Sequence, residues 1–309
     1  MIDYTSDYSY RTFGIGTIIK PSIIDRDDYI RSRYKLTGTD SVKTDITKEL
    51  SKSFSKKTKK VLAFSDPEIH FLINFKNESC QLHSKSITFS GRYVKTVRGI
   101  TQKQKSCINC NGDGCRTCLL HGISEFTSIE GIISQYIFKK FGGTTAKFTW
   151  IGGEDKSSLV LGTGRPFFVK LHHPNKRTSK LTSIDLDSIK VKNLKIIDKF
   201  PQKPIMFNSS IKIKISSKST LDSQYLKKLK NICNNPVMVY EKSGKRFEKQ
   251  IFSLSYKKHS LHNFSLFVKV EGGLPIRRFI EGGDVSPNIS DILNCKCICE
   301  EFDFHNIEV

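Results

Sequence analysis

One stretch in the middle of the chain, residues 150–170, constrains the fold more than any other part of the sequence. It contains two turn signals, Gly152-Gly153 and Gly162-Thr163-Gly164, and it ends in an apolar segment that starts at Phe167. Glycine is needed where the backbone turns with positive φ or where a ligand approaches closely. The pattern therefore predicts two tight turns followed by a strand.

Two carboxylates, those of Glu154 and Asp155, lie between these turns, and Arg165 follows the second turn. A carboxylate placed between two turns and beside an arginine is typical of a reactive acid at the edge of a sheet. An ordinary hairpin with a surface acid has the same pattern, so both interpretations stay open from the residues alone.

The charge of the chain indicates a polyanionic partner. The 309 residues include 51 Lys and Arg against 30 Asp and Glu, a net charge of +21. Residues 170–250 alone carry 19 basic and 6 acidic side chains, a net of +13. This one-signed excess favours nucleic acid over a membrane surface as the partner. The sequence has no basic amphipathic helix, leader or long apolar run, so we expect a cytoplasmic protein that does not bind membranes.

A second segment, residues 91–100, carries basic and aromatic side chains between two glycines. Arg92, Tyr93 and Arg98 are residue types that contact phosphate or stack on a base. They are therefore candidate RNA-binding residues, and an exposed edge strand is the alternative interpretation of the same segment.

Four of the nine cysteines fall within twelve residues, at Cys107, Cys110, Cys115 and Cys118. Two CxxC pairs can supply four thiolates in a tetrahedral shell around zinc, and metal or reduced thiols are expected before disulfides in an intracellular chain. A site closed by four cysteines has no open ligand position, so its role would be structural or RNA-contacting.

Apolar periodicity predicts an α+β protein. Helices are expected over residues 41–60, 128–141 and 219–231, and strands over residues 69–75, 86–89, 211–215 and 264–270. Residues 1–104 are expected to form helices packed on one face of a small sheet.

Taken together, these motifs resemble the archaeal tRNA pseudouridine synthases that modify positions 54 and 55 of the TΨC arm. The motifs are Gly91-Arg92-Tyr93, Arg98-Gly99-Ile100, CxxCxGxGCxxC from Cys107, Gly152-Gly-Glu-Asp155, Leu161-Gly-Thr-Gly-Arg-Pro-Phe167 and Gly273-Leu-Pro-Ile-Arg277. The resemblance implies a THUMP-like α/β RNA-binding domain (residues 1–104), a four-cysteine zinc-knuckle insertion (105–122) and a catalytic domain with a mixed, largely antiparallel sheet (123–309).

The resemblance also implies roles for individual residues. Asp155 matches the catalytic aspartate of that family, Arg277 the basic residue that pairs with it, and Ile276 the apolar residue beside that basic residue. Ile211 stands where the family has an active-site tyrosine, and Gly153 stands where it has an arginine.

An enzyme of this family isomerises uridine without a redox or nucleotide cofactor. The implied partner is the TΨC arm of tRNA, with no obligate protein partner. Arg165 is a further candidate for contacting phosphate or the flipped base, and a structural salt bridge is the alternative.

The alternative function is a non-catalytic tRNA-binding protein on the same scaffold, which the departures at positions 153 and 211 favour. The retained pair of Asp155 and Arg277 favours the enzyme. A metal-dependent nuclease is disfavoured because the sequence lacks the acidic cluster that such sites need.

Overall fold

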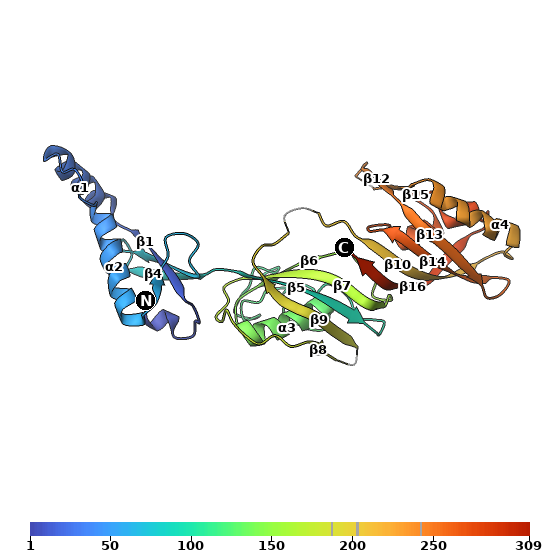
Figure 1. Ribbon diagram of the computed structural model, residues 1–309, viewed down its shortest axis with the longest axis horizontal. Helices are drawn as coiled ribbons and strands as arrows, with labels where there is room; N and C mark the ends of the chain where they lie inside the picture. Colours follow the sequence, from blue (N-terminus) through green and yellow to red (C-terminus); the bar gives the residue numbers. More distant parts are fainter. Residues whose placement is uncertain (187, 202–203, 242) are drawn as a thin grey trace.

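The computed structural model describes residues 1–186, 188–201, 204–241 and 243–309. Its elements follow one another along the molecule in Figure 1, from an N-terminal sheet with two helices, through a large sheet, to a small sheet at the other end. Among the described residues, no helix has the length and apolar composition that crossing a membrane requires.

The N-terminal part contains a four-stranded sheet in the order β2-β1-β3-β4. Its elements are η1 (Asp3–Thr5), β1 (Thr12–Ile18), α1 (Pro21–Arg33), α2 (Val42–Thr58), β2 (Val61–Leu62), β3 (Ile69–Asn74) and β4 (Ser79–Ser84).

Helix α2 packs on this sheet through one aromatic side chain. The hydroxyl of Ser41 caps the helix by accepting the N–H of Thr44 at 3.3 Å. Phe54 then meets Phe13 of β1 and Phe71 of β3 in edge contacts, with ring centroids 4.8 and 5.1 Å apart. The predicted helix and small sheet at the N-terminus are therefore confirmed.

The large sheet has nine strands in the order β13-β14-β10-β16-β7-β5-β9-β8, with β6 paired to β7. The strands are β5 (Ile87–Lys95), β6 (Ala146–Trp150), β7 (Val160–Leu171), β8 (Ile184–Asp185), β9 (Ile189–Ile197), β10 (Asn208–Ser217), β13 (Ile251–Lys258), β14 (Asn263–Glu271) and β16 (Cys297–Glu308). Only the β16–β7 pairing among these described strands is parallel, so the expected mixed, largely antiparallel sheet is confirmed.

The remaining elements cover parts of the large sheet and share its hydrophobic core. Helix α3 (Ile129–Phe141) meets β5 through an edge contact between Phe141 and Phe89, with ring centroids 4.9 Å apart. At the C-terminal end lie α4 (Ser223–Lys228), η2 (Leu229–Asn234), α5 (Ile276–Glu281), α6 (Ile289–Ile292) and a three-stranded sheet of β11 (Val237–Tyr240), β12 (Arg246–Lys249) and β15 (Val285–Ser286).

The predicted limit of the first domain at residue 104 is wrong. Strand β5 pairs with β7 and β9, with Tyr93 opposite Arg165 and Val191, so it belongs to the large sheet. The alternation of residues 86–89 showed a half-buried strand but not which sheet contains it, because the same pattern suits either. The N-terminal part therefore ends before Ile87.

A turn that follows β7 joins the two parts. Arg177 donates from Nη2 to the backbone carbonyls of Glu68 and Lys85, at 2.6 Å each. The hydroxyl of Ser84 donates to the carbonyl of Pro174 at 2.7 Å. These bonds attach the basic turn at residues 172–177 to the edge of the N-terminal sheet.

Candidate active site

Asp155 lies in the loop between β6 and β7, where its backbone is fixed by a local turn. Gly152 has φ +77°, which lets the chain reverse after β6. The Oδ1 atom of Asp155 accepts the backbone N–H of Ser157 at 2.9 Å and the hydroxyl of Ser157 at 3.0 Å. This Asx-type turn fixes the orientation of the carboxylate.

Arg277, at the start of α5, is 122 positions away from Asp155 in the sequence but pairs with it. Its Nε donates to Asp155 Oδ2 at 3.1 Å, and its Nη2 donates to the hydroxyl of Ser157 at 3.2 Å. Its Nη1 donates to the carbonyl of Cys299 in β16 at 2.9 Å. The predicted approach of Asp155 and Arg277 is therefore present in the structure.

The pair remains accessible to a large substrate. The side chains of Asp155 and Arg277 are 34% and 40% exposed. The N–H of Ser157 has the largest effect on the pKa of Asp155 and lowers it. Burial opposes this effect, but the hydroxyl of Ser157 and the guanidinium of Arg277 lower the pKa further, so it lies below its usual value. Asp155 is thus an ionised carboxylate at neutral pH that faces solvent.

A buried polar network lies directly behind Asp155. The side chain of Glu154 is fully buried, and its Oε1 is 2.9 Å from the Nζ of Lys95 in a buried ion pair. Its Oε2 accepts the hydroxyl of Tyr93 at 2.9 Å and faces the Nε of Arg165 at 3.4 Å. The Nζ of Lys95 also donates to the carbonyl of Asp155 at 3.3 Å, which connects the network to the loop that carries Asp155.

Two of the residues predicted to bind the substrate, Tyr93 and Arg165, belong to this network, where both side chains contact Glu154. Both are fully buried, and burial is the main reason that the pKa of Tyr93 lies well above its usual value. The salt-bridge alternative for Arg165 is the one that the structure contains. The sequence could not show this, because the pattern does not reveal that Glu154 points inward.

The other two basic candidates, Arg92 and Arg98, bind protein acceptors. Arg92 donates to the carbonyls of Thr163 and Gly164 at 2.9 and 2.8 Å, which fixes the second glycine turn. Arg98 forms a two-point ion pair with Asp303 at 2.7 and 2.8 Å. These guanidiniums hold the loops around the site together instead of presenting free donors to phosphate.

The two apolar candidates differ in position. Ile276 is buried in the hydrophobic core, so it anchors the start of α5 and does not form a contact surface. Ile211 in β10 is also buried, but it lines a cavity of about 170 Å³ together with Gly153 and Gly273. Sequence analysis missed Lys95 and Ser157, although a serine two positions after an aspartate is a recognisable turn pattern.

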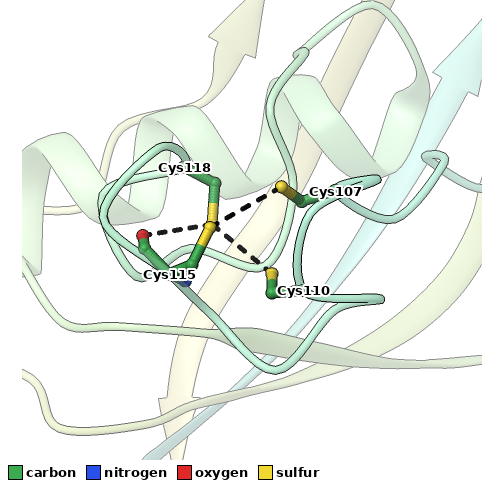
Figure 2. A group of neighbouring side chains, drawn as sticks. All are labelled: Cys107, Cys110, Cys115 and Cys118. Carbon is green, nitrogen blue, oxygen red and sulfur yellow. Dashed lines mark hydrogen bonds between the residues drawn. The ribbon is translucent and has the colours of Figure 1, made fainter.

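The four predicted zinc ligands come together in one loop cluster, as Figure 2 shows. Their Sγ atoms lie within 4.8 Å of one another, with separations of 3.9, 3.8 and 3.7 Å for three of the pairs. A tetrahedral shell with Zn–S distances of about 2.3 Å needs sulfur separations of about 3.8 Å. The cluster therefore has the geometry to hold a structural zinc ion.

Backbone groups around the cluster support thiolate ligands. The N–H of Cys115 and the N–H of Gly122 point at Cys118 Sγ at 3.2 and 3.3 Å, and they lower the pKa of that thiol to about 6. His121 stacks on Phe138 of α3 with ring centroids 3.9 Å apart, so the cluster is packed against the large domain.

Comparisons with known proteins match the whole chain to one family. The family model described as "Pus10, C-terminal" matches residues 89–308, and the model described as "Pus10 THUMP domain, archaeal" matches residues 1–74.

Curated relatives of the chain carry the name of the same family. A protein of Nitrosopumilus maritimus named "tRNA pseudouridine synthase Pus10" is 62% identical over 309 residues, which is 100% of this chain and 81% of the relative. Proteins of the same name from Cenarchaeum symbiosum and Methanocaldococcus jannaschii are 34% and 28% identical, each over 98% of this chain and over 75% and 70% of the relative.

Removing one cysteine of the cluster should remove the metal. We expect the purified protein to contain about one zinc ion per chain, because four thiolates close a tetrahedral shell. Cys107→Ser should lower the zinc content and the melting temperature, as measured by elemental analysis and calorimetry. Cys80→Ser, outside the cluster, is the matched control; equal zinc in both variants would contradict the assignment.

Breaking the buried network should destabilise the protein. Lys95→Met removes the closer of the two buried cations that pair with Glu154 and leaves only Arg165 at 3.4 Å, which should cost about 3 kcal/mol in the free energy of unfolding. Lys156→Met, at an exposed position of the same loop, should change that free energy by less than about 0.5 kcal/mol. Urea unfolding of the full chain measures both, and similar values would argue against the network.

Proposed function

The chain belongs to the Pus10 family, and on this basis we propose that it is a tRNA pseudouridine synthase that acts on uridine 54, uridine 55 or both in the TΨC arm. Asp155 is the catalytic carboxylate in this proposal, and Arg277 holds it. We place the enzyme in the cytoplasm, where its tRNA substrate is found.

The observation that carries the proposal is the contact between Asp155 and Arg277. The β6–β7 loop and the start of α5 are far apart in the sequence, but they bring Arg277 Nε to 3.1 Å from Asp155 Oδ2 at a partly exposed position. A protein that only bound RNA would gain little from an exposed carboxylate, because a carboxylate repels phosphate. The arginine therefore supports a chemical role for Asp155.

The reaction fits a single ionised carboxylate. The N1–C1′ bond of uridine breaks, the base turns, a C5–C1′ bond forms, and the proton on C5 moves to N1. No electrons are exchanged with a redox cofactor in these steps. A carboxylate near the sugar can act as nucleophile or as base in such a sequence.

Binding of tRNA is supported by the charge and by the N-terminal domain. The net charge of +21 favours phosphate contacts, which offset the few kcal/mol needed to take a base out of its stack. The match of residues 1–74 to an archaeal THUMP domain supports a second RNA-binding unit at one end of the molecule.

Replacing Asp155 should abolish the reaction while leaving tRNA binding intact. Asp155→Asn keeps the shape of the side chain but removes its charge, so the rate of pseudouridine formation on an unmodified tRNA transcript should fall by at least about a hundredfold. Asp45→Asn, on an exposed position of α2, is the control. Position-specific mapping of pseudouridine locates the product.

The outcomes separate the enzyme from the alternative. Pseudouridine in the TΨC arm that disappears with Asp155→Asn supports the proposal. Tight tRNA binding by the wild-type protein without any pseudouridine would favour the non-catalytic RNA-binding protein instead.

The pH dependence of the rate should report the contact with Arg277. The carboxylate is charged above its folded pKa, so activity is present above that pKa and is lost as the pH falls through it. Arg277 contributes to lowering this pKa. Arg277→Met should therefore move the acidic limb of the single-turnover rate to higher pH, while Arg277→Lys should stay close to the wild type. An unmoved limb in Arg277→Met would refute the electrostatic role.

A further inference from the structure

The loop cluster that Figure 2 shows carries the two most exposed large aliphatic side chains among the described residues. Ile108, next to Cys107, is 92% exposed, and Leu119, next to Cys118, is 74% exposed. Leu120 follows at 50%. We call these three side chains the knuckle tip. Large apolar side chains that gather at one exposed place mark an interaction site.

Two residues of the knuckle tip also have an unfavourable backbone conformation. The φ angles of Leu119 and Leu120 are +51° and +65°. L-residues rarely adopt this left-handed conformation, because the Cβ atom comes too close to the following carbonyl oxygen. Two consecutive leucines in this conformation therefore make the turn less stable than other residues would.

The first CxxC pair shows which residues suit the same turn. The two residues that follow it are Asn111 and Gly112, with φ +50° and +102°. The two residues that follow the second pair are Leu119 and Leu120. Asparagine and glycine adopt positive φ most readily. The second turn thus exposes two apolar side chains where a polar residue and a glycine fit better, which indicates a role outside the fold.

The backbone beneath the knuckle tip is closely packed. The N–H of Leu120 donates to the carbonyl of Cys115 at 2.8 Å, and the N–H of Leu119 donates to the carbonyl of Arg116 at 3.1 Å. A Cβ atom added at Gly114 would lie 2.7 Å from the carbonyl oxygen of Leu120. An ordered turn therefore presents the tip, and a ligand does not have to fix it first.

The base of the same loop cluster adjoins the candidate active site. Residues 101–105, which lead into the cluster, line a cavity of about 680 Å³ together with Gly153, Glu154 and Lys156. These last three residues belong to the loop that carries Asp155. An RNA strand that reaches Asp155 therefore passes close to the loop cluster.

The charges in this cavity favour RNA as the partner of the neighbouring tip. Three exposed lysines, Lys103, Lys105 and Lys156, line the cavity, against one exposed carboxylate, that of Glu125. Lysines at such a place bind phosphate. Unpaired bases of RNA add flat faces that apolar side chains can cover. Basic and apolar side chains side by side thus match the two parts of a nucleotide.

We propose that the knuckle tip is a contact surface for unpaired bases of the tRNA beside the target uridine, with Ile108, Leu119 and Leu120 packed against the faces of these bases. This inference rests on the proposed function. Turning a nucleotide out of a folded arm removes the stacking partner of its neighbours. Proteins that separate stacked bases place apolar side chains such as Leu and Ile against them.

The test replaces exposed side chains and leaves the cysteines in place. The double variant Ile108→Ser/Leu119→Ser should raise the Kd of the full chain for an unmodified tRNA transcript about fivefold to twentyfold, because less apolar surface leaves water on binding. The slope of log Kd against log salt concentration should stay the same, since no charge is removed. Leu261→Ser, at a 62% exposed position between β13 and β14, is the matched control and should bind like the wild type.

A fully paired RNA duplex separates base contacts from phosphate contacts. It offers phosphates but no open base faces, so the wild type and the double variant should bind it with equal Kd. Equal Kd values of the two proteins for the tRNA would overturn the inference. So would an equal loss on tRNA and duplex, because this would indicate an altered phosphate contact. Self-association of the wild type that the double variant lacks, measured by analytical ultracentrifugation, would assign the tip to a protein interface instead.

A second variant uses the strained backbone. Leu119→Asn gives the second turn the residue that the first turn has, so the melting temperature and the zinc content should not fall, while the Kd for tRNA should rise about threefold. An unchanged Kd would overturn the role of Leu119. Binding is measured here without turnover. Wild-type protein that binds tRNA through the tip but forms no pseudouridine would therefore refute the proposed function and not the contact.

Discussion

The buried charge of Glu154 is the interaction on which the rest of the site depends. A carboxylate removed from water is costly unless it is paired and hydrogen-bonded. Lys95 from β5 and Arg165 from β7 supply the charges, and Tyr93 supplies a hydrogen bond. These contacts fix the loop that carries Glu154 to two central strands of the large sheet. Because Asp155 is the next residue of that loop, its backbone is held in place as well.

The two adjacent acids have opposite environments and therefore opposite roles. Glu154 points into the interior and is paired there with Lys95 and Arg165, whereas Asp155 is partly exposed and pairs with Arg277 of α5. Because Arg277 also binds the carbonyl of Cys299 in β16, the pair of Asp155 and Arg277 connects α5, β16 and the β6–β7 loop. The paired and buried Glu154 thus fixes the loop on which Asp155 stays partly exposed.

Sequence reasoning located the elements better than the orientation of side chains. The helix at α2, the strands at β3 and β10 and the cysteine cluster follow from periodicity and spacing, which are local properties. The pairing of Asp155 with Arg277 came from resemblance, since nothing local connects positions 122 residues apart.

The features that the sequence did not show have one physical cause. The residue types of Arg165 and Tyr93 suit phosphate and bases, but they bind a buried carboxylate equally well. The inward direction of the Glu154 side chain decides which of these two partners is bound in the structure, and that direction depends on the tertiary structure. For the same reason the sequence did not show that β5 joins the large sheet and not the N-terminal one.

Isoleucine stands at position 211, where the resembling family has a tyrosine, and this difference has to be considered together with the other residues that line the same cavity. A residue in an extended chain shares its face with residues two and four positions away, so an aromatic ring can enter the same cavity from position 207. The glycines at positions 152 and 272 leave the space that such a ring occupies. The cavity therefore contains an aromatic ring although position 211 carries an aliphatic side chain.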